Sequence, residues 1–182
     1  MRMGRTVPDG ALAARVTELR GKALTIIRPA HTWHRFPIVE GNIVSGSVRL
    51  AISGTLARHL ADCHAAYLAC GTLGAGFDAF QRRVSAISGA DALIVQAIGA
   101  ALIEKLMDEV EAEIHRELQP NETLVSRYSP GYGNFPLAAQ RELLLLLDAS
   151  RMVGVSLTDT LLMVPSKSVS AIIGIKEKIP TQ

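Results

Sequence analysis

The sequence has few cysteines, no excess charge of either sign and no long unbroken apolar run. Its two cysteines are too few for a disulfide framework. Nineteen Lys and Arg residues against seventeen Asp and Glu residues give a net charge of +2. These charges are interspersed along the chain, so nucleic acid is not an expected partner. The longest apolar stretch, 92–103, is interrupted by Gln96 and is shorter than the ~20 residues that span a membrane. Because the start also lacks an apolar signal segment, we expect a cytoplasmic protein with no membrane partner.

The chain also lacks a recognisable metal-binding pattern. Two histidines, His31 and His34, do not complete a tetrahedral site by themselves. A second group fits no zinc spacing: His59, Cys63, His64 and Cys70. We therefore expect no metal, and we interpret residues 28–37, which two prolines interrupt, as a surface loop or partner contact.

The length and composition predict one domain with a packed core. The chain has 182 residues, of which 48% are hydrophobic, enough for a substantial core. Periodicity predicts helices early in the chain and strands clustered late, which is typical of an α+β fold rather than of a βαβ repeat. The predicted helices cover 10–24, 55–61 (capped by Ser53), 91–118 and 138–149. The predicted strands cover 44–52, 65–70 and 124–126, and a closing antiparallel pair at 161–164 and 168–175, joined by the loop 165–167.

The longest predicted helix, 91–118, changes character along its length. Its first half is apolar nearly all round, so we expect it to be buried, with Gly99 and Ala100 permitting a close neighbour. Its second half carries five acids that form mostly a solvated face: Glu104, Asp108, Glu109, Glu111 and Glu113. Before this helix, the glycine-rich stretch 71–76 lacks the Walker and dinucleotide spacings, so we interpret it as a strand-to-helix turn.

The stretch 127–136, Arg-Tyr-Ser-Pro-Gly-Tyr-Gly-Asn-Phe-Pro, concentrates the residues suited to ligand binding. Aromatic residues make up 4% of the chain and only three are tyrosines, yet two tyrosines occur here. Two prolines and two glycines prevent a regular helix. Such a loop can bring its backbone close to a ligand and present Arg127 to an anion. The same composition is also typical of an ordinary turn between a strand and a helix.

This motif, followed by a proline and an amphipathic helix, resembles the S-adenosylmethionine-binding segment of the cobalamin-dependent methionine synthase activation domain family. The segment 161–170 is similar to that family's Met-x-Pro-x-x-Ser-Val-Ser strand, and 53–60 and 71–74 resemble its short stand-alone members. The resemblance covers roughly residues 45–175. It implies a single C-shaped domain with a twisted antiparallel sheet flanked by helices. Residues 1–44 would add a helix and a loop to a core at 45–182.

The resemblance implies a module that binds S-adenosylmethionine, docks on a corrinoid protein and supports reductive methylation of cob(II)alamin to methylcobalamin. The partner would be a corrinoid methyltransferase, or a methionine synthase without its own activation domain, with flavodoxin or ferredoxin as electron donor. Cobalamin would be carried by that partner, since this chain has no Asp-x-His-x-x-Gly motif. Such a chain is a component of a methyltransferase system and not a complete enzyme.

The resemblance also implies site residues. Arg127 would clamp the ligand's carboxylate, Ser129 and Gly131 would offer backbone groups, and Tyr132 would contribute its ring. An acid of the long helix would neutralise the ligand's ammonium: a match to the full-length members of the family gives Asp108, whereas the spacing in its short members gives Glu104. Lys167 is a further candidate. At 171–174 the sequence Ala-Ile-Ile-Gly departs from the aromatic residues of full-length members. This departure keeps a second interpretation open, a docking protein that does not use S-adenosylmethionine.

Overall fold

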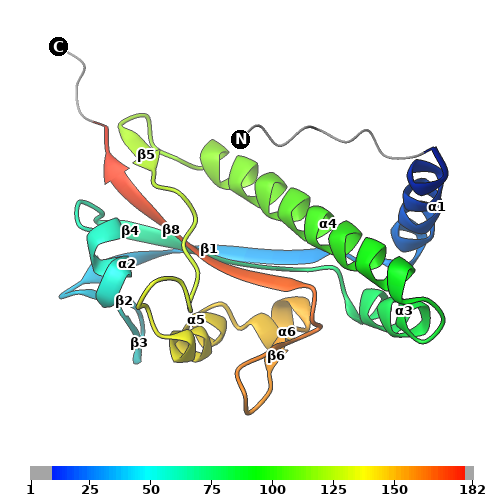
Figure 1. Ribbon diagram of the computed structural model, residues 1–182. Helices are drawn as coiled ribbons and strands as arrows, with labels where there is room; N and C mark the ends of the chain where they lie inside the picture. The colour runs from blue at the N-terminus through cyan, green and yellow to red at the C-terminus, as the bar shows by residue number, and fades with distance from the viewer. Residues whose placement is uncertain (1–9, 179–182) are drawn as a thin grey trace, which may run out of the picture.

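The computed structural model describes residues 10–178, which form an antiparallel sheet flanked by helices (Figure 1). The six-stranded sheet has the order β3-β2-β1-β4-β8-β5, and every neighbouring pair is antiparallel. The predicted α+β class is therefore confirmed. The strands are β1 (Ala30–Val39), β2 (Asn42–Ser45), β3 (Val48–Ala51), β4 (Ala65–Thr72), β5 (Glu122–Leu124) and β8 (Ser168–Glu177); β6 (Ser156–Leu157) and β7 (Met163–Val164) form a separate small sheet.

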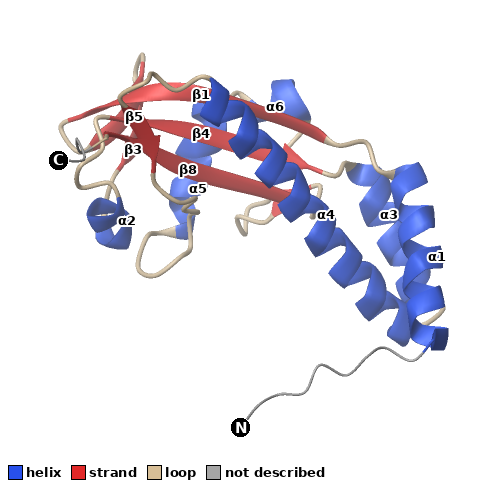
Figure 2. Ribbon diagram, turned by 90° about the horizontal axis from the view of Figure 1, so that it is seen from above, coloured by secondary structure: helices blue, strands red, loops and turns tan. Residues whose placement is uncertain are grey.

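The helices lie on both faces of the sheet and beyond one end of it. The long helix α4 crosses one face, α5 and α6 lie on the other, and α1 and α3 pack beside the first half of α4 (Figures 1 and 2). No helix within residues 10–178 is long and apolar enough to cross a membrane. The helices are α1 (Gly10–Ile26), α2 (Gly54–His59), α3 (Ala75–Ser85), α4 (Gly89–Arg116), α5 (Gln140–Leu146) and α6 (Ala149–Val153), with a 3-10 turn at Leu137–Ala139 before α5.

The two central strands, β4 and β8, sort their side chains onto the two faces by simple alternation. Tyr67 and Ile173 pair across the strands and belong to the cluster that packs against α4. Their neighbours Leu68 and Ile172 also pair, and they belong to the cluster on the opposite face. All eight residues of β4 are buried. Covering both faces explains why β4 is mostly apolar instead of alternating with polar residues.

Helix α4 is less buried in its apolar half than its sequence indicates. Gly99 permits the expected close approach, because a Cβ at that position would lie 2.5 Å from the Phe77 ring. Val95 and Ile98 are buried, but Leu93 is 74% exposed. The expectation of burial all round is wrong because α1 and α3 cover only part of this half.

Two early segments differ from the predictions. Residues 28–37 are not a surface loop: from Ala30 onward they form β1, which pairs with β4 from Ala30↔Thr72 to Pro37↔Ala65. Thr32 and Phe36 are buried on one side of this strand. The predicted strand 44–52 is instead the β2–β3 hairpin, whose turn contains Gly46 at φ 55°.

Two late segments also differ. The predicted closing pair does not form, because β7 pairs with β6 whereas β8 pairs with β4 and β5. The predicted helix 138–149 is divided into α5 and α6 by Asp148, which adopts a left-handed conformation at φ 48°. Leu143 and Leu147 are buried on the inner side of this segment.

A carboxylate at the start of β5 connects three parts of the sheet region. Glu122 has only 6% of its side chain exposed. It accepts hydrogen bonds from Arg35 of β1 at 2.6 and 3.0 Å and from the Gln119 amide at 3.0 Å, and it contacts His64 Nε2 at 3.2 Å. The Arg35 guanidinium is the main cause that lowers the pKa of Glu122 to about 2, with the amide and His64 adding to it against the opposing effect of burial.

We expect Glu122→Gln to lower the free energy of unfolding at pH 7 by about 2 kcal/mol, the usual size for a hydrogen-bonded charge. The folded-state pKa of Glu122 lies below its ordinary value of 4.5. Its contribution is therefore present above pH 4.5 and is lost as the pH falls towards 2. Chemical denaturation between pH 7 and pH 2.5 should show the difference from wild type shrinking in that window. The exposed Glu117→Gln serves as control, and a difference that does not change with pH would contradict the assignment.

Candidate functional site

Half of the residues of the 127–136 motif border a cavity of about 380 Å³ between α4, the motif loop and the start of β8. This volume falls within the range of about 300–1,000 Å³ found for small-molecule sites. The cavity brings together four of the predicted site residues: Glu104, Arg127, Ser129 and Tyr132. It is also lined by Tyr128, Pro130, Gln140, Met163, Ser168, Val169, Ser170 and Ala171.

The motif is attached to the sheet by a single β-bridge. Tyr128 donates its amide to the Ile172 carbonyl at 2.9 Å and accepts the Ile172 amide at 2.7 Å. The next residue adds a third contact, because the Ser129 hydroxyl donates to the Ser170 carbonyl at 2.7 Å. These bonds hold the loop beside β8. The Ser129 hydroxyl is thus engaged within the fold even though the residue lines the cavity.

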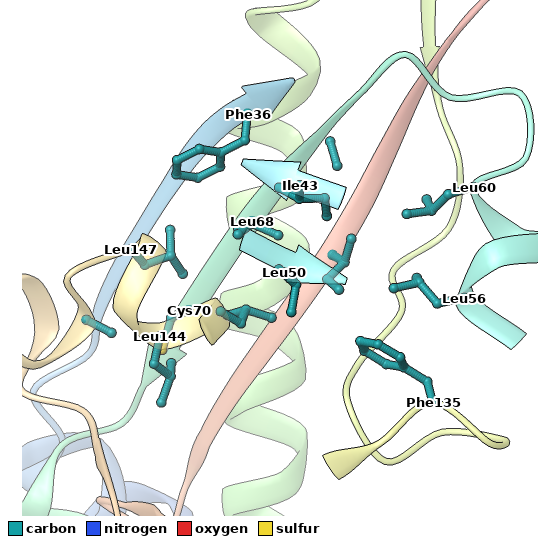
Figure 3. Packing of buried hydrophobic residues seen from close by; sticks show 14 of the residues in the cluster. Phe36, Ile43, Leu50, Leu56, Leu60, Leu68, Cys70, Phe135, Leu144 and Leu147 are labelled. Atoms are coloured by element: carbon teal, nitrogen blue, oxygen red, sulfur yellow. The ribbon is translucent and has the colours of Figure 1, made fainter. Parts of the chain in front are cut away.

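The turn that follows is fixed by one glycine and one buried ring. Gly131 has φ 91°, a conformation that glycine adopts without strain. Its amide donates to the Phe135 carbonyl at 3.0 Å. The Phe135 side chain is 2% exposed and points into the core beside Leu56 (Figure 3). Phe135 is therefore part of the core, while Tyr132 remains 67% exposed at the cavity.

Helix α2 is joined to the loop by side-chain hydrogen bonds. Asn134 accepts the Thr55 amide through its side-chain oxygen at 2.6 Å. This contact caps α2 in place of Ser53, whose hydroxyl makes no capping bond. The Thr55 hydroxyl also bonds to the Tyr128 hydroxyl, and His59 Nε2 lies 2.7 Å from the Ser126 carbonyl. The loop and α2 therefore order each other.

Three acids of α4 surround Arg127. Its Nη2 lies 2.8 Å from Asp108 Oδ1 and 3.4 Å from Glu104 Oε2, and its Nε lies 3.3 Å from Glu111 Oε2. The guanidinium side chain is 24% exposed, so it faces the helix and not bulk water. Three carboxylates against one guanidinium leave this side of the cavity with an excess of negative charge. Such an excess favours a ligand that carries more positive than negative charge.

The structure separates the two candidate acids by position. Glu104 lines the cavity, whereas Asp108 contacts Arg127 without lining it. Gly131 is likewise absent from the lining and shapes the turn. Lys167 does not line the cavity either. Its side chain lies beside Gly99, and burial there lowers the pKa of its amino group. The ligand-binding roles of all these residues stay predictions.

Sequence reasoning missed several residues of this region. Glu111 is not a solvated residue, because it is 28% exposed and pairs with Arg127. Its spacing from Glu104 and Asp108, at i, i+4 and i+7, places all three acids on one helical face and was a usable signal. Gln140 and Met163 also line the cavity. Their positions depend on how α5 and β7 pack, and no pattern in the sequence indicates that.

The cysteines and histidines do not assemble into a second site. Among residues 10–178, no group of three or more His, Cys, Asp or Glu side chains is placed to hold a metal ion. Burial raises the pKa of the Cys70 thiol to about 12 and also raises that of Cys63. Burial thus disfavours the thiolate form of both cysteines.

Comparisons with known proteins agree on one family and one fold. Residues 69–179 match the family model described as vitamin B12 dependent methionine synthase, activation domain. A solved structure described as the MetH reactivation domain bound to AdoHcy matches with a TM-score of 0.60 and 18% identity. The alignment covers 95% of this chain and 68% of that one. At this identity the likeness shows the fold. The comparison with curated proteins gave no match.

The contact between Asn134 and α2 can be tested by itself. Asn134→Ala should remove the cap of α2 and lower the free energy of unfolding by about 1 kcal/mol, the usual value for a lost cap. Asn134→Asp keeps an acceptor oxygen at the same place and should stay close to wild type. Urea denaturation followed by circular dichroism measures both. Equal stability of the Ala variant and wild type would show that the loop does not depend on this bond.

Proposed function

Because the chain belongs to the vitamin B12 dependent methionine synthase activation domain family, we propose that it binds S-adenosylmethionine in the cavity beside Arg127. It then docks on a corrinoid protein and supports reductive methylation of cob(II)alamin to methylcobalamin. The partner is a corrinoid methyltransferase or a methionine synthase that lacks its own activation domain. The single observation that carries the proposal is the gathering of Glu104, Arg127, Ser129 and Tyr132 around one cavity of suitable size.

The charges of the cavity suit each end of this ligand. The Arg127 guanidinium can bind the amino-acid carboxylate through two parallel hydrogen bonds. Glu104, which lines the cavity, can accept the ligand's ammonium, and its negative charge favours the positive sulfonium. We assign this role to Glu104, and we assign to Asp108 the holding of Arg127 at 2.8 Å before the ligand arrives.

The exposed ring of Tyr132 suits contact with a second molecule. It is 67% exposed at the cavity and its backbone carbonyl accepts a hydrogen bond from the Tyr128 hydroxyl at 3.2 Å, so the ring is presented on an anchored backbone. We assign Tyr132 to the ligand or to the edge of the partner's corrin ring.

The chemistry is divided between this chain and its partner. Cobalamin, carried by the partner, supplies the atom that accepts the methyl group. This chain binds the methyl donor and fixes its orientation, which removes a large entropic part of the barrier. The methyl group leaves as a cation equivalent and S-adenosylhomocysteine remains, so cobalt would have to supply both electrons of the new bond. The partner's cob(II)alamin would therefore first take up one electron from a separate donor, such as flavodoxin or ferredoxin.

A second candidate function is docking on a corrinoid protein without use of S-adenosylmethionine. The observation that favours it is the pairing of Arg127 with three acids of its own chain, which satisfies the guanidinium without a ligand. In that case the cavity is a by-product of packing, and the exposed Tyr132 serves partner contact alone.

Titration calorimetry with S-adenosylmethionine separates the two functions. Arg127→Ala should weaken binding by about 100-fold, because a charge-assisted bidentate contact of roughly 3 kcal/mol is lost. Arg116→Ala, an exposed arginine at the end of α4, is the matched control and should bind like wild type. Equal affinity of Arg127→Ala and wild type, or no binding even with the corrinoid partner present, would contradict the proposal. Partner capture that is unaffected by Arg127→Ala would then support the second function.

The negative excess of the cavity predicts a preference for the methylated ligand. S-adenosylmethionine carries one positive charge more than S-adenosylhomocysteine, so wild type should bind it about fivefold more tightly at low salt. Glu104→Gln should narrow that ratio, whereas Glu109→Gln, on the same helix, should keep it. Competition calorimetry at two salt concentrations measures the ratio. If Glu104→Gln leaves the ratio of the two affinities unchanged, Glu104 does not contribute to ligand binding.

A further inference from the structure

The three carboxylates around Arg127 contact two different parts of its guanidinium. Asp108 and Glu104 both reach Nη2, at 2.8 and 3.4 Å. Glu111 reaches Nε, at 3.3 Å. A carboxylate that binds the terminal end of an arginine uses its two Nη atoms. A partner on Nε therefore does not compete with such a ligand, whereas a partner on Nη2 does.

The same three acids also differ in exposure. The Asp108 and Glu104 side chains are 69% and 62% exposed, but that of Glu111 is 28% exposed. Ion pairs with exposed partners are weak and exchange readily with water or with other ions. Glu111 is the most shielded of the three acids, and it does not line the cavity. It is thus suited to remain in place while the other contacts change.

The helix supplies a reason for this arrangement. Residues 104, 108 and 111 share one face of α4, where like charges at these spacings repel each other. Arg127 offsets that repulsion as long as it stays against the helix. When a ligand carboxylate takes Nη2, Asp108 loses its partner, and without a second anchor the guanidinium is free to follow the ligand or to turn away.

We propose that Glu111 is a positioning residue: it holds Arg127 by Nε so that the ligand's carboxylate can replace Asp108 on Nη2 while the guanidinium keeps its place. This inference rests on the proposed binding of S-adenosylmethionine. The inference gives each acid a different role. Glu111 keeps its contact with Arg127, Asp108 gives up its contact to the ligand, and Glu104 faces the cavity.

The test compares two ligands that differ only in the carboxylate, S-adenosylmethionine and its decarboxylated form. Glu111→Gln should weaken binding of S-adenosylmethionine by about tenfold, the effect of losing one charge-assisted contact. The same substitution should change binding of the decarboxylated ligand less than about twofold, because that ligand has no carboxylate to bind the Nη atoms of Arg127. In an Arg127→Ala background, Glu111→Gln should cause no further loss. Glu109→Gln is the control on the same helix.

The outcomes separate this inference from the function it rests on. Binding that depends on Arg127 but not on Glu111 overturns the inference and leaves the proposed function intact. An equal loss for both ligands, or a full tenfold loss in the Arg127→Ala background, means that Glu111 acts through the fold and also overturns it. Failure of wild type to bind S-adenosylmethionine overturns both. Thermal midpoints of each variant confirm that binding is measured on folded protein.

Discussion

The bridge between Tyr128 and Ile172 is the constraint on which the site depends. Two backbone hydrogen bonds of 2.9 and 2.7 Å fasten an irregular segment to one of the two central strands. Because Arg127 directly precedes this bridge, its side chain lies against α4 and does not extend into solvent. Because Ser129 directly follows it, the loop turns over the start of β8 and closes the cavity. One backbone pairing thereby sets the position of a charge and the shape of a pocket.

The charges near this bridge work against the stability of α4 taken alone. Three acids on one helical face repel each other, and a protein selected only for stability gains by replacing one of them. Arg127 balances one negative charge, and of the three acids Glu104 is the one that lines the cavity. Local sequence preferences that conflict with stability are expected where a site is built. The acids of α4 are the clearest conflict of this kind around the cavity.

The sequence predicted the elements whose periodicity is regular and whose neighbours are close in the chain. The helices at 10–24 and 91–118 and the strand at 65–70 are present with small changes of boundary. Strand β1 was missed because Pro37 and several polar residues obscure its pattern, while its paired residues in β4 lie 28 to 42 positions away in the chain. The pairing of β8 was misassigned for a similar reason. Its partners β4 and β5 lie far away in the chain, whereas β7 directly precedes it and was therefore taken as its partner.

The candidate site shows the same limit at the level of single residues. A contiguous motif predicted Arg127, Ser129 and Tyr132, and these residues do border one cavity. The sequence could not show that the Ser129 hydroxyl and the Gly131 amide are already used by the backbone of Ser170 and Phe135. These two donors therefore hold the loop in place. Among the residues that line the cavity, Glu104 of α4 and Tyr132 of the loop stay well exposed. The loop is accordingly the frame of the candidate site, and Arg127 and Glu104 bring opposite charges to its border.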